Sequence, residues 1–355
     1  MYHLFGCTRR RCIKTVGVLP ILLVLVLVVW SYYAYVFIFC PQIYATSPLQ
    51  ATSYFLLCHA FLVPFAWSYY LVVMTSPGHP IQMDETTPAC ETVVDIPLND
   101  GLRRDVSNSS LGNGPPPLAH MYTNEAAVPL ARSNDRGYED VALDPAEGAR
   151  GIAGNRSLEV KSDGKRRYCN KCANWKPDRT HHCSVCGICV LKLDHHCPWL
   201  NNCVGFYNYK FFFLFILYGV LYCLFLFVTL ALNTGNFNDF LMGIGTMGFQ
   251  PTFILIVSGV FALCLLIFLG VHLHLVLSNR STIESMEGDR RVRLPDGSIG
   301  TAPSGNLYDL GTRKNLEQIF GKRWQLWLIP VYSSIGDGHH FPYNRAVYRK
   351  LFAEA

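Results

Sequence analysis

The chain has 355 residues and carries little charge. Only 15% of its residues are Asp, Glu, Lys or Arg, whereas soluble globular domains carry about a quarter. Half of the residues are hydrophobic, and the mean hydropathy is +0.21. This composition argues against an intrinsically disordered chain and against an ordinary soluble enzyme.

The charge is missing from long stretches. Residues 15–83, 211–238 and 240–279 contain no Lys, Arg, Asp or Glu. Uncharged apolar runs of this length are typical of membrane spans, because about 20 helical residues cross the hydrocarbon core. The first run is too long for the hydrophobic core of a cleaved signal peptide, and a second run follows it closely. We predict four transmembrane helices, at residues 15–39, 51–74, 211–232 and 252–277.

The two short connections between these spans, residues 40–50 and 233–251, contain no Lys or Arg. Basic residues precede the first span, lie between the second and third, and follow the fourth. Because cytosolic loops carry the excess of Lys and Arg, we expect both termini and the middle segment to face the cytosol. The net charge of +5 then indicates attraction to the membrane surface and no nucleic-acid binding.

The composition changes along the non-membrane parts. Residues 77–162 are rich in Pro, Gly, Asn, Asp and Ser and lack apolar periodicity, which predicts a mobile linker. The C-terminal region includes Trp324 and Trp327, which fit a short element packed on the cytosolic domain or an amphipathic stretch on the membrane. The resulting divisions are residues 1–76 (N-terminus and first two spans), 77–162 (linker), 163–209 (Cys-rich domain), 210–279 (last two spans) and 280–355 (C-terminal region).

Half of the 14 cysteines lie in the Cys-rich domain, together with four histidines. They are Cys169, Cys172, Cys183, Cys186, Cys189, Cys197 and Cys203, with His181, His182, His195 and His196. Several pairs have the C-x-x-C spacing, which lets two thiolates from one turn reach an ion about 2.3 Å away. In the reducing cytosol, metal binding is favoured over the alternative of disulfides or free thiols. We therefore predict zinc.

Two closed tetrahedral sites need eight ligands, which six Cys and two His would supply. One thiol is then left for chemistry, and Cys197 is the natural candidate because it follows Asp194, His195 and His196 directly. A neighbouring His can activate a thiol, and an Asp beside that His can orient it. The alternative is that residues 194–197 are only further zinc scaffold.

The Asp194-His195-His196-Cys197 run resembles the DHHC protein S-acyltransferases, because it lies in a Cys-rich segment between the second and third of four spans. The surrounding motifs are similar too: residues 169–172 (Cys-x-x-Cys), 176–179 (Lys-Pro-Asp-Arg), 181–189 (His-His-Cys-x-x-Cys-x-x-Cys) and 197–205 (Cys-Pro-Trp-x-Asn-Asn-Cys-Val-Gly). Ser281-Thr282-Ile283-Glu284 resembles the family's Thr-Thr-x-Glu motif, with Ser in first place, and Asn315 the Asn of its C-terminal motif.

The resemblance implies an all-α membrane fold with four transmembrane helices and a two-zinc Cys-rich domain between the second and third. It implies two interleaved structural zinc sites, formed by Cys169, Cys172, His182 and Cys189, and by Cys183, Cys186, His196 and Cys203. Cys197 would be the nucleophile, His195 the general base and Asp194 its orienter. The implied activity is a ping-pong transfer of a fatty acyl group from acyl-CoA to a cysteine of a target protein.

Cys197 lies about a dozen residues before the third span, so its thiol should sit at the membrane–cytosol boundary. The acyl chain could then lie among the helices and CoA in the cytosol. The expected CoA contacts are Lys176, Arg179, His181 and Asn315, and the alternative for Lys176 and Arg179 is a solvated loop charge. The resemblance implies that Ser31 and Tyr222 close the acyl cavity and that Phe212 and Phe215 line it, with Trp30 and Trp199 as further acyl contacts. The medium bulk of Ser31 and Tyr222 suits a chain of about palmitoyl length.

Two other function classes compete with the enzyme. A non-catalytic zinc-bearing membrane adaptor is disfavoured by the thiol that zinc does not need, and an ion transporter by the lack of paired carboxylates in the spans. His272 and His274 point to different helix faces, which argues against a metal site in the fourth span. Expected partners are acyl-CoA, the lipid bilayer and membrane-associated proteins with cysteines near the membrane. The Golgi, endoplasmic reticulum and plasma membrane are all compatible locations.

Overall fold

The structure is a computed structural model that describes residues 16–81, 157–234, 248–288, 290–294, 296–302 and 307–354. Most of the predicted linker and the basic N-terminal residues lie outside these ranges, and so does most of the predicted loop between the third and fourth spans.

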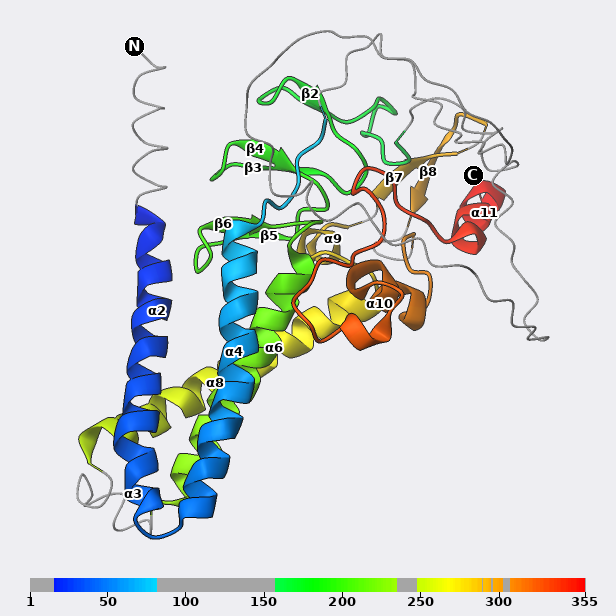
Figure 1. Cartoon of the computed structure of the whole chain (residues 1–355). Coiled ribbons are helices and arrows are strands. Elements are labelled where there is room, and N and C mark those ends of the chain that lie inside the picture. Colours follow the sequence, from blue (N-terminus) through cyan, green and yellow to red (C-terminus); the bar gives the residue numbers. More distant parts are fainter. Residues whose placement is uncertain are drawn as a thin grey trace, which may run out of the picture. The chain divides into compact units, whose positions relative to one another are not determined.

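Four helices in the described ranges are long and apolar enough to cross a membrane, which confirms the predicted fold class (Figure 1). The first consists of α2 (Val18–Tyr33), the π-helical turn η1 (Ala34–Phe39) and α3 (Cys40–Tyr44). The others are α4 (Pro48–Met74), α6 (Tyr209–Leu232) and α8 (Phe249–Leu277). The first helix therefore ends later than predicted.

Prolines explain two of the differences in helix bounds. Pro41 lies in the first turn of α3 and Pro48 in the first turn of α4. At the start of α4 a proline costs no hydrogen bond, because the N–H it lacks has no partner within the helix. Pro41 instead follows directly on the π-helical turn η1, inside one continuous helical span. Pro41 thus does not end the first span, and Pro48 starts the second one earlier than predicted.

The third span, α6, is the centre of the helix packing. It packs against both α4 and α8. Of the most hydrophobic 18-residue stretch in this helix, 50% is buried within the protein. The corresponding shares are 17%, 22% and 22% for the first, second and fourth spans. Because α2 has no buried residue and is apolar all round, it is suited to contact with lipid.

The Cys-rich domain consists of three antiparallel hairpins in the described part of residues 157–209. They pair β1 (Tyr168–Cys169) with β2 (Asn174–Trp175), β3 (His181–Cys183) with β4 (Ile188–Val190), and β5 (His195–Cys197) with β6 (Asn202–Val204). Strands of two or three residues bury too little surface to hold a domain together. The domain therefore needs cross-links of another kind.

Both described ends of the predicted linker pack on the Cys-rich domain. The N–H of Leu191 donates to the carbonyl of Gly78 over 3.0 Å. At the other end, Asp178 accepts from the N–H groups of Leu158 and Glu159 at 3.0 and 2.9 Å. Residues 77–81 and 157–162 thus belong to the folded unit.

The C-terminal region begins with α9 (Thr282–Met286) and a hairpin of β7 (Arg290–Arg293) and β8 (Ile299–Ala302), followed by α10 (Thr312–Phe320), η3 (Trp324–Leu326) and α11 (Arg345–Glu354). Trp327 packs on Phe320, with ring centroids 5.8 Å apart. The hydroxyl of Tyr218 on α6 donates to the carbonyl of Leu328 over 2.6 Å. The segment around Trp327 therefore lies along the third span, while Trp324 stays 71% exposed.

Candidate active site and zinc sites

The structure brings together the first predicted set of zinc ligands, Cys169, Cys172, His182 and Cys189. The Nδ1 atom of His182 lies 3.5, 3.2 and 3.9 Å from the sulfur atoms of Cys169, Cys172 and Cys189. The register of the second hairpin pairs His182 directly with Cys189. One hairpin thus supplies two of the donors and the preceding turn the other two.

The second predicted set, Cys183, Cys186, His196 and Cys203, also meets at one point. Nδ1 of His196 lies 3.3 Å from Sγ of Cys186 and 3.6 Å from Sγ of Cys203. The two sulfur atoms are 3.5 Å apart. The register of the third hairpin pairs His196 with Cys203.

Both clusters fit a tetrahedral zinc ion. Bonds of about 2.0–2.3 Å from zinc to nitrogen and sulfur place neighbouring donors roughly 3.5–3.8 Å apart, which matches the observed distances. Thiolates this close repel one another unless a cation neutralises them. Each cluster supplies four protein donors, so a bound ion would have no open position for a substrate and would stabilise the fold of the short hairpins.

The candidate catalytic residues lie on β5, where the strand geometry separates them from the zinc ligand. Side chains alternate between the two faces of a strand. His195 and Cys197 therefore project to one face, and His196 between them projects to the other, into the second zinc cluster. One strand of three residues thus serves both the structural and the candidate catalytic site.

Asp194 orients His195 and is itself held by two hydrogen bonds from α9. Its Oδ2 atom lies 2.7 Å from Nδ1 of His195, and its two oxygens accept from the N–H and the hydroxyl of Thr282, each at 2.8 Å. Burial alone would raise the pKa of this carboxyl group, but the hydrogen bonds outweigh burial and lower it. Because an ionised carboxylate can only accept, Nδ1 of His195 carries the proton.

His195 connects Asp194 to Cys197. Burial opposes the charged imidazole, but hydrogen bonds to Asp194 and to the Cys197 thiol raise the pKa of His195 to about 9. Because Nδ1 faces Asp194, Nε2 is the nitrogen available to Cys197. A histidine placed in this way can take the proton of the thiol, which is how a neighbouring imidazole activates a cysteine nucleophile.

Cys197 lies where the third hairpin meets the helices, 7% exposed and in a hydrophobic cluster that includes Val72 of α4 and Phe212 of α6. The hydroxyl of Tyr69 on α4 donates to the carbonyl of Trp199 over 3.1 Å. The side-chain amide of Asn202 donates to the carbonyl of Val72 over 3.2 Å. The candidate nucleophile is therefore fixed at one end of the spans.

Aromatic side chains lead from this point to the expected end of the acyl cavity. Phe215 contacts Tyr69, with ring centroids 5.0 Å apart, and Phe65, at 5.2 Å. Phe65 stacks on Tyr222 at 6.2 Å. The hydroxyl of Tyr222 forms a 3.1 Å hydrogen bond with that of Ser31. The structure thus brings Ser31 and Tyr222 together at the end of this series of rings.

The other expected acyl contacts are Trp30, Phe212 and Trp199. The indole N–H of Trp30 donates to the side chain of Gln250 over 3.0 Å. Phe212 contacts the ring of His195, with centroids 5.1 Å apart. Trp199 is 48% exposed.

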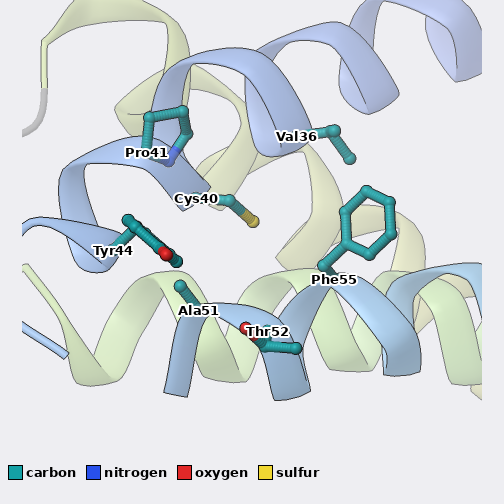
Figure 2. A pocket seen from close by; sticks show the side chains of 7 residues that line it. All are labelled: Val36, Cys40, Pro41, Tyr44, Ala51, Thr52 and Phe55. Atoms are coloured by element: carbon teal, nitrogen blue, oxygen red, sulfur yellow. The ribbon is translucent and has the colours of Figure 1, made fainter. Parts of the chain in front are cut away.

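A cavity of about 420 Å³ lies elsewhere, at the turn between α3 and α4 (Figure 2). It is lined by Val36, Cys40, Pro41, Tyr44, Ala51, Thr52 and Phe55. Cys197 instead belongs to a hydrophobic cluster that includes Tyr69 and Val72, near the opposite end of α4. The lining of this cavity is mostly apolar, and the cavity is not the candidate active site.

Two of the expected CoA contacts have structural roles instead. Arg179 is 1% exposed and donates to both carboxylate oxygens of Glu284, each at 2.7 Å, and to the carbonyl of Asn279. Asn315 is fully buried and donates to the carbonyl of Leu277 and to Asp309. Because these donors are engaged inside the fold, we assign both residues to the fold and not to CoA binding.

The remaining two expected contacts differ in charge. Burial, with a smaller contribution from Arg167, lowers the pKa of His181 to about 4, so this side chain is neutral at pH 7. Lys176 is half-buried. Of the four, Lys176 alone is a basic side chain outside the buried network, which makes it the best-placed phosphate contact among them.

The buried ion pair of Arg179 and Glu284 leads to a stability prediction. Replacing Arg179 by Met leaves the carboxylate of Glu284 without its bidentate partner, and removing one member of a buried pair costs about 3–5 kcal/mol. We expect a loss of this size in the free energy of unfolding, measured by chemical denaturation in detergent. Arg313→Met, which removes an exposed pair with Glu317, is the control and should cost less than about 1 kcal/mol. Equal effects of both substitutions would contradict the assignment.

Three residues of this site are not predicted from the sequence. Thr282 belongs to a motif without a predicted role of its own, and no pattern distinguishes Tyr209. His272 has no predicted role because His274 points to another helix face, yet it is 2% exposed and its ring centroid lies 6.0 Å from that of His195. The signal that could have found it is an ionisable residue inside an apolar span, which is by default a functional candidate.

Known proteins resemble this chain over nearly its whole length. A family model described as DHHC palmitoyltransferase matches residues 162–289. The chain is 33% identical to palmitoyltransferase ZDHHC15 of Xenopus laevis over 340 residues, covering 95% of this chain and 85% of that protein. It is 35% identical to human palmitoyltransferase ZDHHC20 over 335 residues, covering 94% and 78%. The chain belongs to the DHHC palmitoyltransferase family.

Proposed function

We propose that this protein is a protein S-acyltransferase that moves a long-chain acyl group from acyl-CoA to cysteines of target proteins through a thioester on Cys197. The observation that carries the proposal is the His195 side chain, which is hydrogen-bonded to both Asp194 and Cys197. A zinc-bearing adaptor would need no thiol activated in this way. The related proteins named as palmitoyltransferases support the same reaction class.

In the first half-reaction, His195 takes the proton of the Cys197 thiol through Nε2. The Cys197 sulfur attacks the thioester carbonyl of acyl-CoA, forming the new carbon–sulfur bond. The bond to the CoA sulfur breaks, and CoA leaves as a thiol with the proton from His195. Asp194 stabilises the charged imidazole while it holds this proton.

In the second half-reaction, the thiol of a target cysteine takes the place of CoA. His195 accepts the proton of this thiol, and the target sulfur attacks the acyl carbonyl on Cys197. The Cys197 sulfur leaves and recovers the proton, which regenerates the enzyme. His195 can therefore serve as the base in both half-reactions.

We place the acyl chain along the aromatic series from Tyr69 to Tyr222, between the first three spans. Each buried methylene contributes about 0.8 kcal/mol, so a chain enclosed there is bound strongly. The hydrogen-bonded pair of Ser31 and Tyr222 would stop the chain. The CoA part would lie outside the spans near Lys176.

The zinc ligands are proposed to be the two clusters described above, and the ions to have a structural role. We propose that both termini and the Cys-rich domain face the cytosol. The targets would be membrane-associated proteins with cysteines close to the bilayer, in the Golgi, endoplasmic reticulum or plasma membrane.

Replacing Tyr222 by Ala should shift the preferred acyl length upward, because it removes a ring from the end of the proposed path. The measurement is competition among acyl-CoAs of increasing chain length for formation of the acyl-enzyme. Phe227→Ala is the matched control, since this aromatic residue lies on the same helix but is 39% exposed. An unchanged length profile for Tyr222→Ala would remove Tyr222 from this role.

A further inference from the structure

The fourth span brings a second histidine to the candidate catalytic residues. His272 lies in α8, and its Nδ1 atom is hydrogen-bonded to the hydroxyl of Tyr209 on α6 at 3.1 Å. One donor atom each from Asp194, His195 and His272 lie within 4.8 Å of one another. Both His272 and Tyr209 are buried.

Aromatic rings fill the space around these two histidines. Phe212 contacts the ring of His195 at 5.1 Å and that of His272 at 4.9 Å, both at steep angles. Phe268 contacts His272 at 4.5 Å. His272 is therefore fixed by packing as well as by its hydrogen bond to Tyr209.

The cluster of Asp194, His195 and His272 does not have the character of a metal site. Both oxygens of Asp194 accept hydrogen bonds from Thr282, and one also accepts from His195. A cation bound to this carboxylate would compete with the hydrogen bond that orients His195. The cluster is better explained by a role in holding the imidazole in place.

We propose that His272 and Tyr209 form a positioning pair that holds the His195 ring against Asp194 and Cys197 from the side of the spans. This inference rests on the proposed function. His195 is anchored on one side by Asp194, and the packed rings of Phe212 and His272 restrict its rotation on the other. Because catalysis depends on geometry within about 1 Å, a loosened ring should slow the reaction by about 10- to 100-fold.

Helix α8 supports the candidate catalytic residues in two ways. His272 supports His195 directly, and α8 leads into α9, where Thr282 binds Asp194. The orientation of the catalytic base is therefore coupled to the packing of α8 on α6. The fourth span contributes to the reaction as well as to membrane residence.

The test compares acylation of purified full-length variants by palmitoyl-CoA under single-turnover conditions, with zinc content measured on each sample. For His272→Ala we expect the maximal rate of Cys197 acylation to fall about 10- to 100-fold. The acyl-CoA concentration at half-maximal rate and the zinc content should stay unchanged. His272→Asn, which retains a hydrogen-bonding atom near the position of Nδ1, should recover part of the rate. His274→Ala is the matched control, because His274 is exposed on the same helix, and should behave as wild type.

Tyr209→Phe removes only the hydroxyl and should slow acylation in the same direction, so the proposal stays testable if His272→Ala does not fold. Wild-type acylation rates in both His272→Ala and Tyr209→Phe would overturn it, and so would equal losses in the Ala and Asn variants of His272. If the wild-type protein itself forms no adduct on Cys197, the proposed function fails and the pair fails with it. If only the variants behave unexpectedly, the positioning pair alone is wrong.

Discussion

Replacing Cys183 by Ala should lower the zinc content below two ions per chain and destabilise the Cys-rich domain. Cys183 belongs to the second cluster, and the hairpins around it are too short to be stable without cross-links. Structural zinc contributes about 10–16 kcal/mol of binding free energy in small zinc domains, so losing a ligand removes much of the folding free energy. Elemental analysis and the thermal unfolding of the purified protein measure both effects.

The same substitution should also abolish activity, although Cys183 takes no part in the proposed reaction. His196 of the second cluster lies between His195 and Cys197 on β5, so loss of the cluster displaces both. Cys264→Ala, at an exposed cysteine of α8, is the control and should keep two ions. A Cys183→Ala protein with normal zinc content would overturn the ligand assignment.

Replacing Cys197 by Ser should stop transfer of the acyl group to a target cysteine, with a loss of at least about a thousandfold. A serine hydroxyl has a much higher pKa than a thiol, so His195 cannot generate a comparable nucleophile. Zinc content should stay at two ions per chain, because Cys197 belongs to neither cluster. The measurement is transfer of a tagged acyl group from acyl-CoA to a membrane-anchored cysteine peptide.

Cys264→Ser makes the same chemical change at an exposed cysteine away from the site and should leave transfer unaffected. Substantial transfer by Cys197→Ser would mean that another thiol carries the acyl group. Loss of zinc from Cys197→Ser would place Cys197 in the scaffold, which is the alternative that spacing alone left open.

The four spans could be predicted from missing charge because the bilayer excludes charged side chains from long stretches. Their bounds were harder to predict. Pro41 suggests the end of a helix, yet the chain continues through a π-helical turn and Pro41 occupies the first turn of α3. Whether a proline breaks a helix depends on its position in the turn, which the sequence does not show.

The local part of the site could also be predicted. Cysteine and histidine spacing indicated metal binding, and alternation along β5 explains why His195 and Cys197 lie on the face opposite His196. The pairing of the zinc ligands came from the family resemblance, because spacing alone allows other combinations. The structure groups the same residues.

Contacts between distant segments could not be predicted. Both a phosphate contact and a solvated loop charge are compatible with Arg179 in the sequence, but the side chain is buried against Glu284, 105 residues further along the chain. His272 looked like an isolated polar residue in a span, and only the packing of α8 on α6 brings it to His195. Both outcomes depend on tertiary packing, which local sequence patterns do not encode.

The most direct test of the central claim is the intact mass of the purified wild-type protein after incubation with palmitoyl-CoA, followed by peptide mapping. The account predicts a mass increase of one palmitoyl group, located on Cys197 and removed by hydroxylamine. A protein that gains no acyl group, or gains it on another cysteine while Cys197 stays free, would contradict the account.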